Sequence, residues 1–420
     1  MRTDLRYALE LDEQDPLGLF RNEFAIADPH LIYLDGNSLG RLPKRAGAHL
    51  RRAIEHTWGE RLIRGWGEEW FTAPQRVGAK IARLIGAQPD EVIVCDSTSV
   101  NLFKLVMAAL HAQPGRRKIV TDDLNFPTDV YVMQGALQLA GQNFRLEMVH
   151  SGDGMTLSDD ALSAAIDEDT ALVELTHTAF KSGYVYPLRT ITDMAHRAGA
   201  WILWDLSHSA GAMPLELSGA KVDMAVGCTY KYLNGGPGAP AFLYIRKDLQ
   251  EQLLSPVWGW FGQKEQFDMA LSYRPAPGLT RFLAGTPTIL SLSAVEPSVD
   301  LILEAGIDRL REKSVRQTEY LIGLWEETLR PLGVKLNSPR EATRRGSHVS
   351  LGHPEGLRID RALIEEMDVI PDFRYPDNIR FGIAPLYTSF ADIHEAMARL
   401  RRVLEERLFE KYPKERPDVT

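Results

Sequence analysis

The chain has 420 residues, of which 44% are hydrophobic and 25% charged, enough for a large buried core and a second, smaller domain. Its net charge of -9 excludes the concentrated positive charge that nucleic-acid binding requires. Two cysteines, Cys95 and Cys228, both in apolar runs, exclude a disulfide framework and a cysteine-rich zinc site, and no apolar stretch approaches the ~18 residues of a membrane span. We therefore expect a cytoplasmic protein that binds neither nucleic acid, membrane nor metal.

The first predicted elements lead into the main domain. A short strand at 31–35 ends at Gly36-Asn37-Ser38, and helical periodicity follows over 46–62. Short β-branched runs then alternate with helical stretches, which places strands at 91–94, 118–121, 171–175, 201–204, 222–228 and 241–245. Because such strands lack tight hairpins and require crossovers, we predict an α/β fold whose mainly parallel sheet is covered by helices on both faces.

The last third of the chain has a different pattern. Two helical patterns fill 289–329 and lead to a smaller α+β domain from about Gly333, with strands at 346–352 and 378–383 and a closing helix at 393–409. We predict three parts: a lead-in segment (1–60), a large cofactor-binding domain (61–300), and a linking helix with the small C-terminal α+β domain (301–420).

The strongest chemical signal is Lys231, which leaves the predicted strand 222–228 and enters the glycine-rich turn 233–238 with tyrosines on both sides. Partial shielding lowers the pKa of such a lysine toward the neutral amine that bonds covalently to a carbonyl cofactor. A lone lysine is more often an ordinary surface residue. Its neighbours in the fold therefore decide the interpretation.

Asp205 ends the predicted strand 201–204, one helix and one strand before Lys231. In a parallel sheet both residues emerge at the same edge, where ligands bind. A carboxylate there can pair with a protonated pyridine nitrogen and keep the ring an electron sink, although a helix cap is its simpler role. The pair Asp205 and Lys231 is far more specific than either residue alone.

Two further loops fall at the same edge. Asp96-Ser97-Thr98-Ser99 precedes the helical pattern 100–110, so its hydroxyls and backbone amides could hold a phosphate or simply cap the helix. In Asn125-Phe126-Pro127-Thr128-Asp129, Phe126 could stack on a ring and Asp129 could accept a hydrogen bond, or the segment could be only a turn. The sequence contains no competing GxGxxG, Walker or HExxH motif.

These motifs together resemble the aminotransferase-like, fold-type-I pyridoxal-phosphate enzymes, and three further stretches resemble the kynureninase family specifically. They are 33–40 (Tyr-Leu-Asp-Gly-Asn-Ser-Leu-Gly), 259–262 (Gly-Trp-Phe-Gly) and 380–390, which begins Arg-Phe-Gly and ends Pro-Leu-Tyr-Thr-Ser-Phe. The likeness covers nearly the whole chain. It implies hydrolysis of L-kynurenine to anthranilate and L-alanine with pyridoxal 5'-phosphate, in tryptophan catabolism and NAD biosynthesis.

The resemblance also implies roles for particular residues. Lys231 would hold the cofactor covalently, Asp205 would pair with the ring nitrogen, and Tyr230 would be either an acid/base or a phosphate ligand. The other implied cofactor contacts are Thr98, Ser99, Phe126, Asp129, Thr176, His208, Trp260 and Thr286, and the implied substrate contacts are Arg380, Trp66 and Gly285. Arg380 would bind the substrate carboxylate bidentately, unless it serves only in a structural salt bridge.

The resemblance further implies a homodimer, with Trp260 and Thr286 able to reach a site across the interface. Trp66 and Gly285 offer no partner for a ring hydroxyl, so we predict a preference for L-kynurenine over 3-hydroxykynurenine. Three alternatives stay open: a small-molecule aminotransferase, a non-catalytic binding module, and a cysteine desulfurase. The last needs an exposed nucleophilic cysteine, whereas both cysteines lie in predicted strands.

Overall fold

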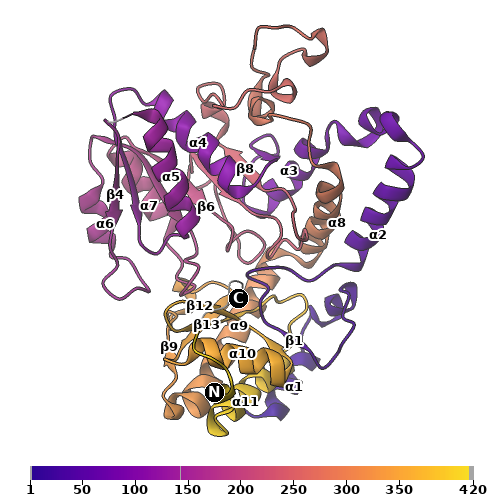
Figure 1. The fold of residues 1–420 in the computed structure, drawn as a ribbon, viewed down its shortest axis with the longest axis vertical. Coiled ribbons are helices and arrows are strands. Elements are labelled where there is room, and N and C mark those ends of the chain that lie inside the picture. The colour runs from indigo at the N-terminus through magenta and orange to yellow at the C-terminus, as the bar shows by residue number, and fades with distance from the viewer. Residues whose placement is uncertain (1, 142, 416–420) are drawn as a thin grey trace.

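The computed structural model describes residues 2–141 and 143–415, which form a large lobe and a small lobe (Figure 1). The large lobe is built on a seven-stranded sheet of order β2-β8-β7-β6-β5-β3-β4. Its strands are β2 (Val92–Val94), β3 (Lys118–Asp122), β4 (Arg145–Val149), β5 (Thr170–Thr176), β6 (Trp201–Asp205), β7 (Met224–Gly227) and β8 (Phe242–Ile245). Neighbouring strands between β4 and β7 are parallel, and β8 is antiparallel to β7 and β2. The predicted mainly parallel sheet is confirmed.

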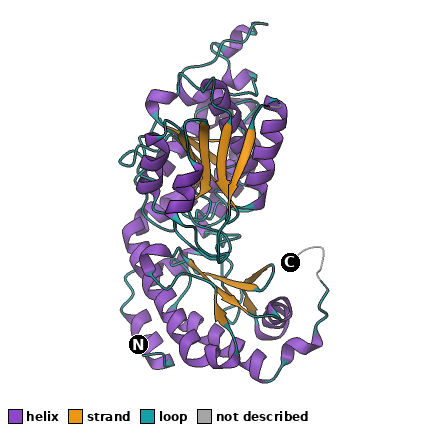
Figure 2. Ribbon diagram, turned by 90° about the vertical axis from the view of Figure 1, so that its left-hand side faces the viewer, coloured by secondary structure: helices purple, strands orange, loops and turns teal. Residues whose placement is uncertain are grey.

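Helices cover both faces of this sheet, as Figure 2 shows. They are α3 (Ala73–Leu84), α4 (Thr98–Ala112), α5 (Pro127–Ala140), α6 (Asp159–Ala165), α7 (Leu188–Arg197) and α8 (Ile289–Ala305), while α2 (Lys44–Arg52) packs on the outer side of α8. In α4 the residues Leu102, Leu105, Val106 and Ala109 recur at helical spacing and are fully buried. With a helix on each face, the inner strands carry continuous apolar runs rather than alternating ones.

The small lobe contains a four-stranded antiparallel sheet of order β12-β13-β10-β9. Its elements are α9 (Ile307–Leu324), β9 (Lys335–Leu336), β10 (His348–Gly352), α10 (Gly356–Met367), β11 (Val369–Ile370), β12 (Asp372–Arg374), β13 (Asn378–Gly382) and α11 (Phe390–Glu405). The N-terminal elements α1 (Leu5–Glu13) and β1 (Ile32–Tyr33) also lie here: Ala8 and Leu11 join the small-lobe core, and β1 pairs with β11. The start of the chain therefore packs with its end, while the predicted domain boundaries stay a prediction.

Two local features differ from the prediction. The helix predicted over 46–62 is α2, which ends at Arg52 and continues only as a π-helical turn, Ala53–Trp58. Strand β4 was not predicted, because it lies at the sheet edge and lacks a fully buried apolar run. The two helical patterns predicted over 289–329 are α8 and α9, which Gly306, with a φ of +83°, separates. No helix in the described part of the chain is both long and apolar enough to cross a membrane.

Candidate active site

A cavity of about 340 Å³ lies at the C-terminal ends of β5 and β6 and beside the turn after β7. The register of β5 and β6 places Thr176 next to Asp205, and both side chains line the cavity. The predicted residues that line it are Thr98, Ser99, Phe126, Asp129, Thr176, Asp205, His208, Tyr230, Lys231 and Arg380. Parallel strands deliver these loops to one edge, as expected for this class of sheet.

Lys231 reaches into the cavity from the turn after β7. Its Nζ lies 2.8 Å from His208 Nε2 and 6.0 Å from the ring centres of both Phe126 and Tyr230. Burial, reinforced by the positive charge of Lys231, lowers the pKa of His208 well below its usual value. His208 is therefore a neutral ring at physiological pH, able to accept the lysine hydrogen bond.

The turn that carries Lys231 packs against the lead-in motif. Gly40 N donates to Tyr230 O at 2.8 Å, and a Cβ added at Gly40 would lie 2.4 Å from Lys231 O. Only glycine permits this approach. The motif 33–40 thus packs against the backbone of the turn that carries Lys231, which explains why this motif ends in glycine.

Two buried carboxyl groups, Asp205 and Asp129, face the cavity. Asp205 Oδ1 accepts from Ser207 N at 2.8 Å and from Ser207 Oγ at 2.6 Å, which fixes its orientation. Burial raises the pKa of Asp205, while Ser207 and Lys231 oppose the rise. Burial and the Asp205 charge raise the pKa of Asp129 well above its usual value, and Asp129 Oδ2 has no hydrogen-bond partner among the described residues. Ionising both carboxyl groups of the pair is therefore disfavoured.

The N-terminus of α4 offers hydroxyl groups and amides to the cavity. Ser97 makes the N-cap bond, accepting from Val100 N at 3.4 Å. Thr98 and Ser99 are therefore not needed for capping, and both line the cavity. The helix macrodipole adds partial positive charge at this point, so the site suits a phosphate.

Arg380, from β13 of the small lobe, closes the other side of the cavity. Its Nε donates to Asp372 Oδ1 at 2.6 Å, its Nη1 to Phe180 O at 2.5 Å and its Nη2 to Ser38 Oγ at 3.1 Å. Burial opposes ionisation of Asp372, but the charge and hydrogen bonds of Arg380 prevail and lower the pKa of Asp372 to about 2. Asp372 also accepts from Nη2, so it holds the Nε/Nη2 edge of the guanidinium. Because Ser38 Oγ takes the second hydrogen of Nη2 and Phe180 O takes one of Nη1, a carboxylate that binds bidentately at the Nη1/Nη2 end has to displace Ser38 Oγ from Nη2.

Four predicted site residues do not line this cavity: Trp66, Trp260, Gly285 and Thr286. Trp66 and Trp260 both pack on Phe261, at ring-centre distances of 5.7 and 4.6 Å. Trp260 is 42% exposed, and Gly285 and Thr286 are also exposed. Within one chain the structure therefore separates these residues from Lys231, so our placement of them beside the others does not hold for a single subunit.

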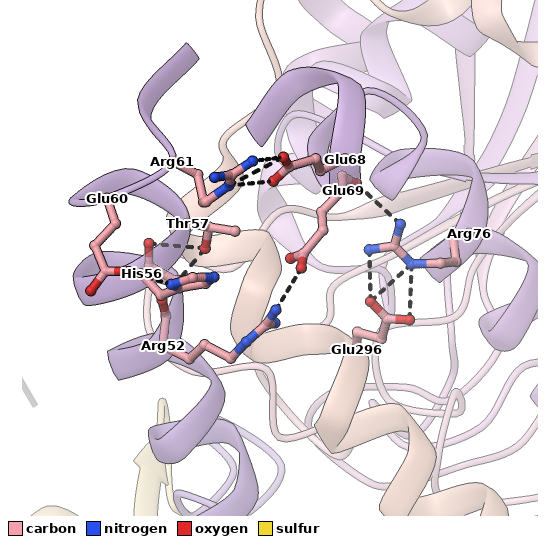
Figure 3. A network of polar contacts seen from close by, with 10 residues as sticks. Arg52, His56, Thr57, Glu60, Arg61, Glu68, Glu69, Arg76 and Glu296 are labelled. Carbon is pink, nitrogen blue, oxygen red and sulfur yellow. Dashed lines mark hydrogen bonds and ion pairs between the residues drawn. The ribbon is translucent and has the colours of Figure 1, made fainter. Parts of the chain in front are cut away.

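The segment that carries Trp66 is held by ion pairs rather than by deep burial. Figure 3 shows Arg52 paired with Glu69 at 2.7 Å, and Arg76 paired with Glu296 of α8 at 3.0 Å. Surface pairs of this kind contribute little individually, ~0 to 1 kcal/mol each. Together with the Arg76 Nη1 hydrogen bond to Glu69 O at 3.1 Å and the packing of Trp66 on Phe261, they connect this segment to the rest of the large lobe.

Several cavity residues were missed from the sequence: Asn37, Ser38, Thr128, Phe180, Ser207 and Arg374. Asn37 and Ser38 lie in the motif 33–40, and Ser207 lies two residues after Asp205, so proximity to recognised motifs was an available signal. Phe180 and Arg374 offered none, because long-range packing alone brings them to the cavity.

The chemistry of the cavity fits pyridoxal phosphate. One space is lined by a lysine for the cofactor aldehyde, a buried carboxylate for its ring nitrogen, an aromatic side chain for its ring face and a helix N-terminus for its phosphate. The buried atoms Asp129 Oδ2 and His208 Nδ1 have no hydrogen-bond partner among the described residues, so they can bond to a bound group. Within residues 2–141 and 143–415, no three His, Cys, Asp or Glu side chains are grouped so as to hold a metal ion.

Comparison with known proteins gives a consistent result. The family model of the kynureninase C-terminal domain matches residues 310–400. The chain is 43% identical over 404 residues to a kynureninase of Pseudomonas fluorescens, covering 95% of each chain. A cysteine desulfurase of Thermococcus onnurineus NA1 has a TM-score of 0.76 at 19% identity, covering 97% of this chain and 99% of that one, which shows a shared fold only. By sequence identity over nearly its full length, the chain belongs to the kynureninase family.

Proposed function

We propose that the protein is a pyridoxal-phosphate-dependent hydrolase that converts L-kynurenine and water to anthranilate and L-alanine. The observation that carries the proposal is one cavity that holds Lys231, Asp205 and Arg380 together. Membership of the kynureninase family points to the same reaction. A structure of similar fold, at a TM-score of 0.79 and 19% identity, is described as having glycine covalently linked to its PLP cofactor. Retention of the lysine, aspartate and arginine also disfavours a purely structural use of the cofactor.

The N-terminus of α4 would hold the cofactor phosphate, and Lys231 would bond covalently to the cofactor aldehyde. Thr98, Ser99 and Tyr230 supply hydroxyl groups for the phosphate, and Phe126 supplies a ring face. Asp205 lies where it can pair with the ring nitrogen, while Asp129, Thr176 and His208 line the remaining sides. Each side chain thereby meets a group of matching chemistry.

When bound, the cofactor supplies an electron sink for the charge that develops at the substrate α-carbon. Arg380 holds the α-carboxylate, and Lys231, released from its covalent link, moves the α-proton. Water adds at the γ-carbonyl, the bond between the β- and γ-carbons breaks, and anthranilate leaves before the alanine portion is protonated. Tyr230 is half-buried beside Lys231, and its hydroxyl can serve either as an acid in these steps or as a phosphate ligand.

The alternatives are less well supported. A cysteine desulfurase needs an exposed thiolate, but Cys95 and Cys228 are buried and neither lines the cavity. Burial raises the pKa of the Cys95 thiol to about 12, so it is not a nucleophile near neutral pH. An aminotransferase would use the same cofactor residues, so the geometry of the site does not distinguish the two activities. Identification of the reaction products does.

We also propose a homodimer in which the partner subunit completes the site. The exposed large apolar side chains Trp58, Ile63, Trp258, Phe267 and Leu271 support an interface, as does the segment between β8 and α8, which projects from the large lobe (Figure 1). Trp66, Trp260, Gly285 and Thr286 would then reach the cavity of the other subunit. Light scattering should give twice the chain mass. We further propose a cytoplasmic location and roles in tryptophan catabolism and NAD biosynthesis.

The decisive experiment uses purified protein saturated with pyridoxal phosphate. On addition of L-kynurenine, the fluorescence of anthranilate should rise, and one equivalent of alanine should form for each anthranilate. A protein that consumes kynurenine only when an α-keto acid is added, without releasing anthranilate, would be an aminotransferase. A protein that binds no cofactor would contradict the whole proposal.

A further inference from the structure

Glu174 is a fully buried acidic residue in the middle of the large sheet that the reaction does not use. It lies on β5, two residues before Thr176, so both side chains point to the same face of the sheet. Thr176 lines the cavity but Glu174 does not. A carboxyl group is rarely buried without a partner, because burial without hydrogen bonds is costly. Its contacts therefore indicate its purpose.

Glu174 contacts the turn that carries Phe126. Asn125 Nδ2 donates to Glu174 Oε2 at 2.5 Å and to Thr121 Oγ1 at 3.1 Å, and Asn125 Oδ1 accepts from Phe126 N at 2.9 Å. Asn125 is itself buried, so water does not replace these bonds. A chain of hydrogen bonds thus runs from the centre of β5 through one amide side chain to the backbone of Phe126.

The surroundings of Glu174 are acidic. Asp129 on α5 and Asp205 on β6 lie near it, and burial followed by the charges of Asp129 and Asp205 raises the pKa of Glu174 well above its usual value. A neutral acid still accepts the Asn125 hydrogen bond through its carbonyl oxygen.

We propose that Glu174 is a positioning residue for the cofactor ring, which fixes the turn bearing Phe126 through Asn125. This inference rests on the proposed function, because Phe126 matters as a stacking face only if a planar cofactor binds above it. The contribution of position 174 is the hydrogen bond that it accepts from Asn125.

The test compares binding of pyridoxal phosphate to cofactor-free enzyme for the wild type, Glu174→Met, Glu174→Gln and Asn125→Ala. Glu174→Met removes one of the two acceptors of the buried Asn125 amide and leaves only Thr121 Oγ1, so the Kd should rise roughly ten- to hundredfold. Glu174→Gln keeps an acceptor of the same length and should stay within about threefold of wild type. Asn125→Ala should match Glu174→Met, and the double variant should be no worse than either single one.

A matched control separates positioning from general stability. Glu91 is another buried glutamate, which accepts from Lys247 N at 2.8 Å and Gln88 N at 2.9 Å at the start of β2, away from the cavity. Glu91→Met should lower the Tm of the cofactor-free enzyme but leave the cofactor Kd unchanged. The Kd, the visible absorption maximum and the Tm are measured for every variant.

The outcomes are distinct. If the wild type binds no cofactor, the proposed function fails. If the wild type binds and Glu174→Met binds equally well, only the role of Glu174 is overturned. The role is also overturned if Glu91→Met weakens the cofactor as much, if Glu174→Gln loses as much as Glu174→Met, or if the losses from Glu174→Met and Asn125→Ala add. Should Glu174→Met fail to fold, Asn125→Ala tests the same hydrogen-bond chain.

Discussion

Replacing Arg380 with lysine tests how the small lobe holds the substrate. In the structure the guanidinium of Arg380 donates to Asp372, Phe180 O and Ser38 Oγ, with one edge committed to Asp372. A lysine keeps the charge but has one nitrogen, which cannot bridge these partners and also present a flat fork. Its ammonium is expected to remain on the buried carboxylate of Asp372, leaving the substrate carboxylate without a bidentate partner.

The expected loss follows from these contacts. A bidentate charge-assisted pair is worth on the order of 2 kcal/mol or more, so kcat/KM should fall about thirtyfold, mainly through KM. The buried Phe180 O also loses its donor, which should lower the free energy of unfolding by about 1 to 3 kcal/mol. The visible absorption of the cofactor should barely change, because Arg380 contacts none of the other cavity groups that we assign to the cofactor.

The assay is anthranilate fluorescence at varied L-kynurenine, with urea unfolding of the same preparations. Arg374→Lys is the matched control: Arg374 also lines the cavity and pairs with Asp372 at 2.7 Å, but it is not the predicted carboxylate ligand. Its effect on KM should be smaller. The reasoning is refuted if Arg380→Lys loses cofactor or unfolds while its folded fraction binds L-kynurenine normally, because Arg380 would then be purely structural.

Three further outcomes are expected. Lys231→Ala should abolish turnover and the visible absorption of the bound cofactor while retaining some cofactor through phosphate and ring contacts; unchanged turnover would disprove the cofactor assignment. If the proposed homodimer brings Trp66 and Gly285 to the cavity, they leave an added hydroxyl unpaired, so L-kynurenine should be preferred over 3-hydroxykynurenine by roughly ten- to hundredfold in kcat/KM, and equal values would mean that this assignment is wrong. Burial lowers the pKa of His348 from 6.5 to about 3, so between these pH values the unfolded chain binds a proton at this residue and the folded chain does not. The free energy of unfolding should therefore fall as the pH drops below 6.5, and His348 should account for about 2 kcal/mol of that fall at pH 5. In His348→Phe, the free energy of unfolding measured by urea titration should decline less steeply with falling pH.

The sequence by itself determined the fold class and the core of the site. Lys231, Asp205 and Phe126 each follow a short apolar run, and a strand and the loop that leaves it are adjacent in sequence. Since parallel strands end at one edge, local patterns were enough to bring these loops together. The resemblance carried by motifs such as 33–40 and 380–390 pointed to the family that the comparisons then showed.

Only the tertiary structure decided how the two lobes share the site. Ser38 near the start of the chain, Phe180 after β5 and Asp372 on β12 all meet at Arg380, and Glu174 reaches Phe126 through Asn125. No local pattern marks such partners, because their sequence separations are large and their residue types are common elsewhere. The position of Trp260 outside the cavity was likewise undetermined, since an aromatic side chain carries the same local sequence signal wherever it packs. Packing, hydrogen bonding and burial act through space, and these contacts exist only once the chain has folded.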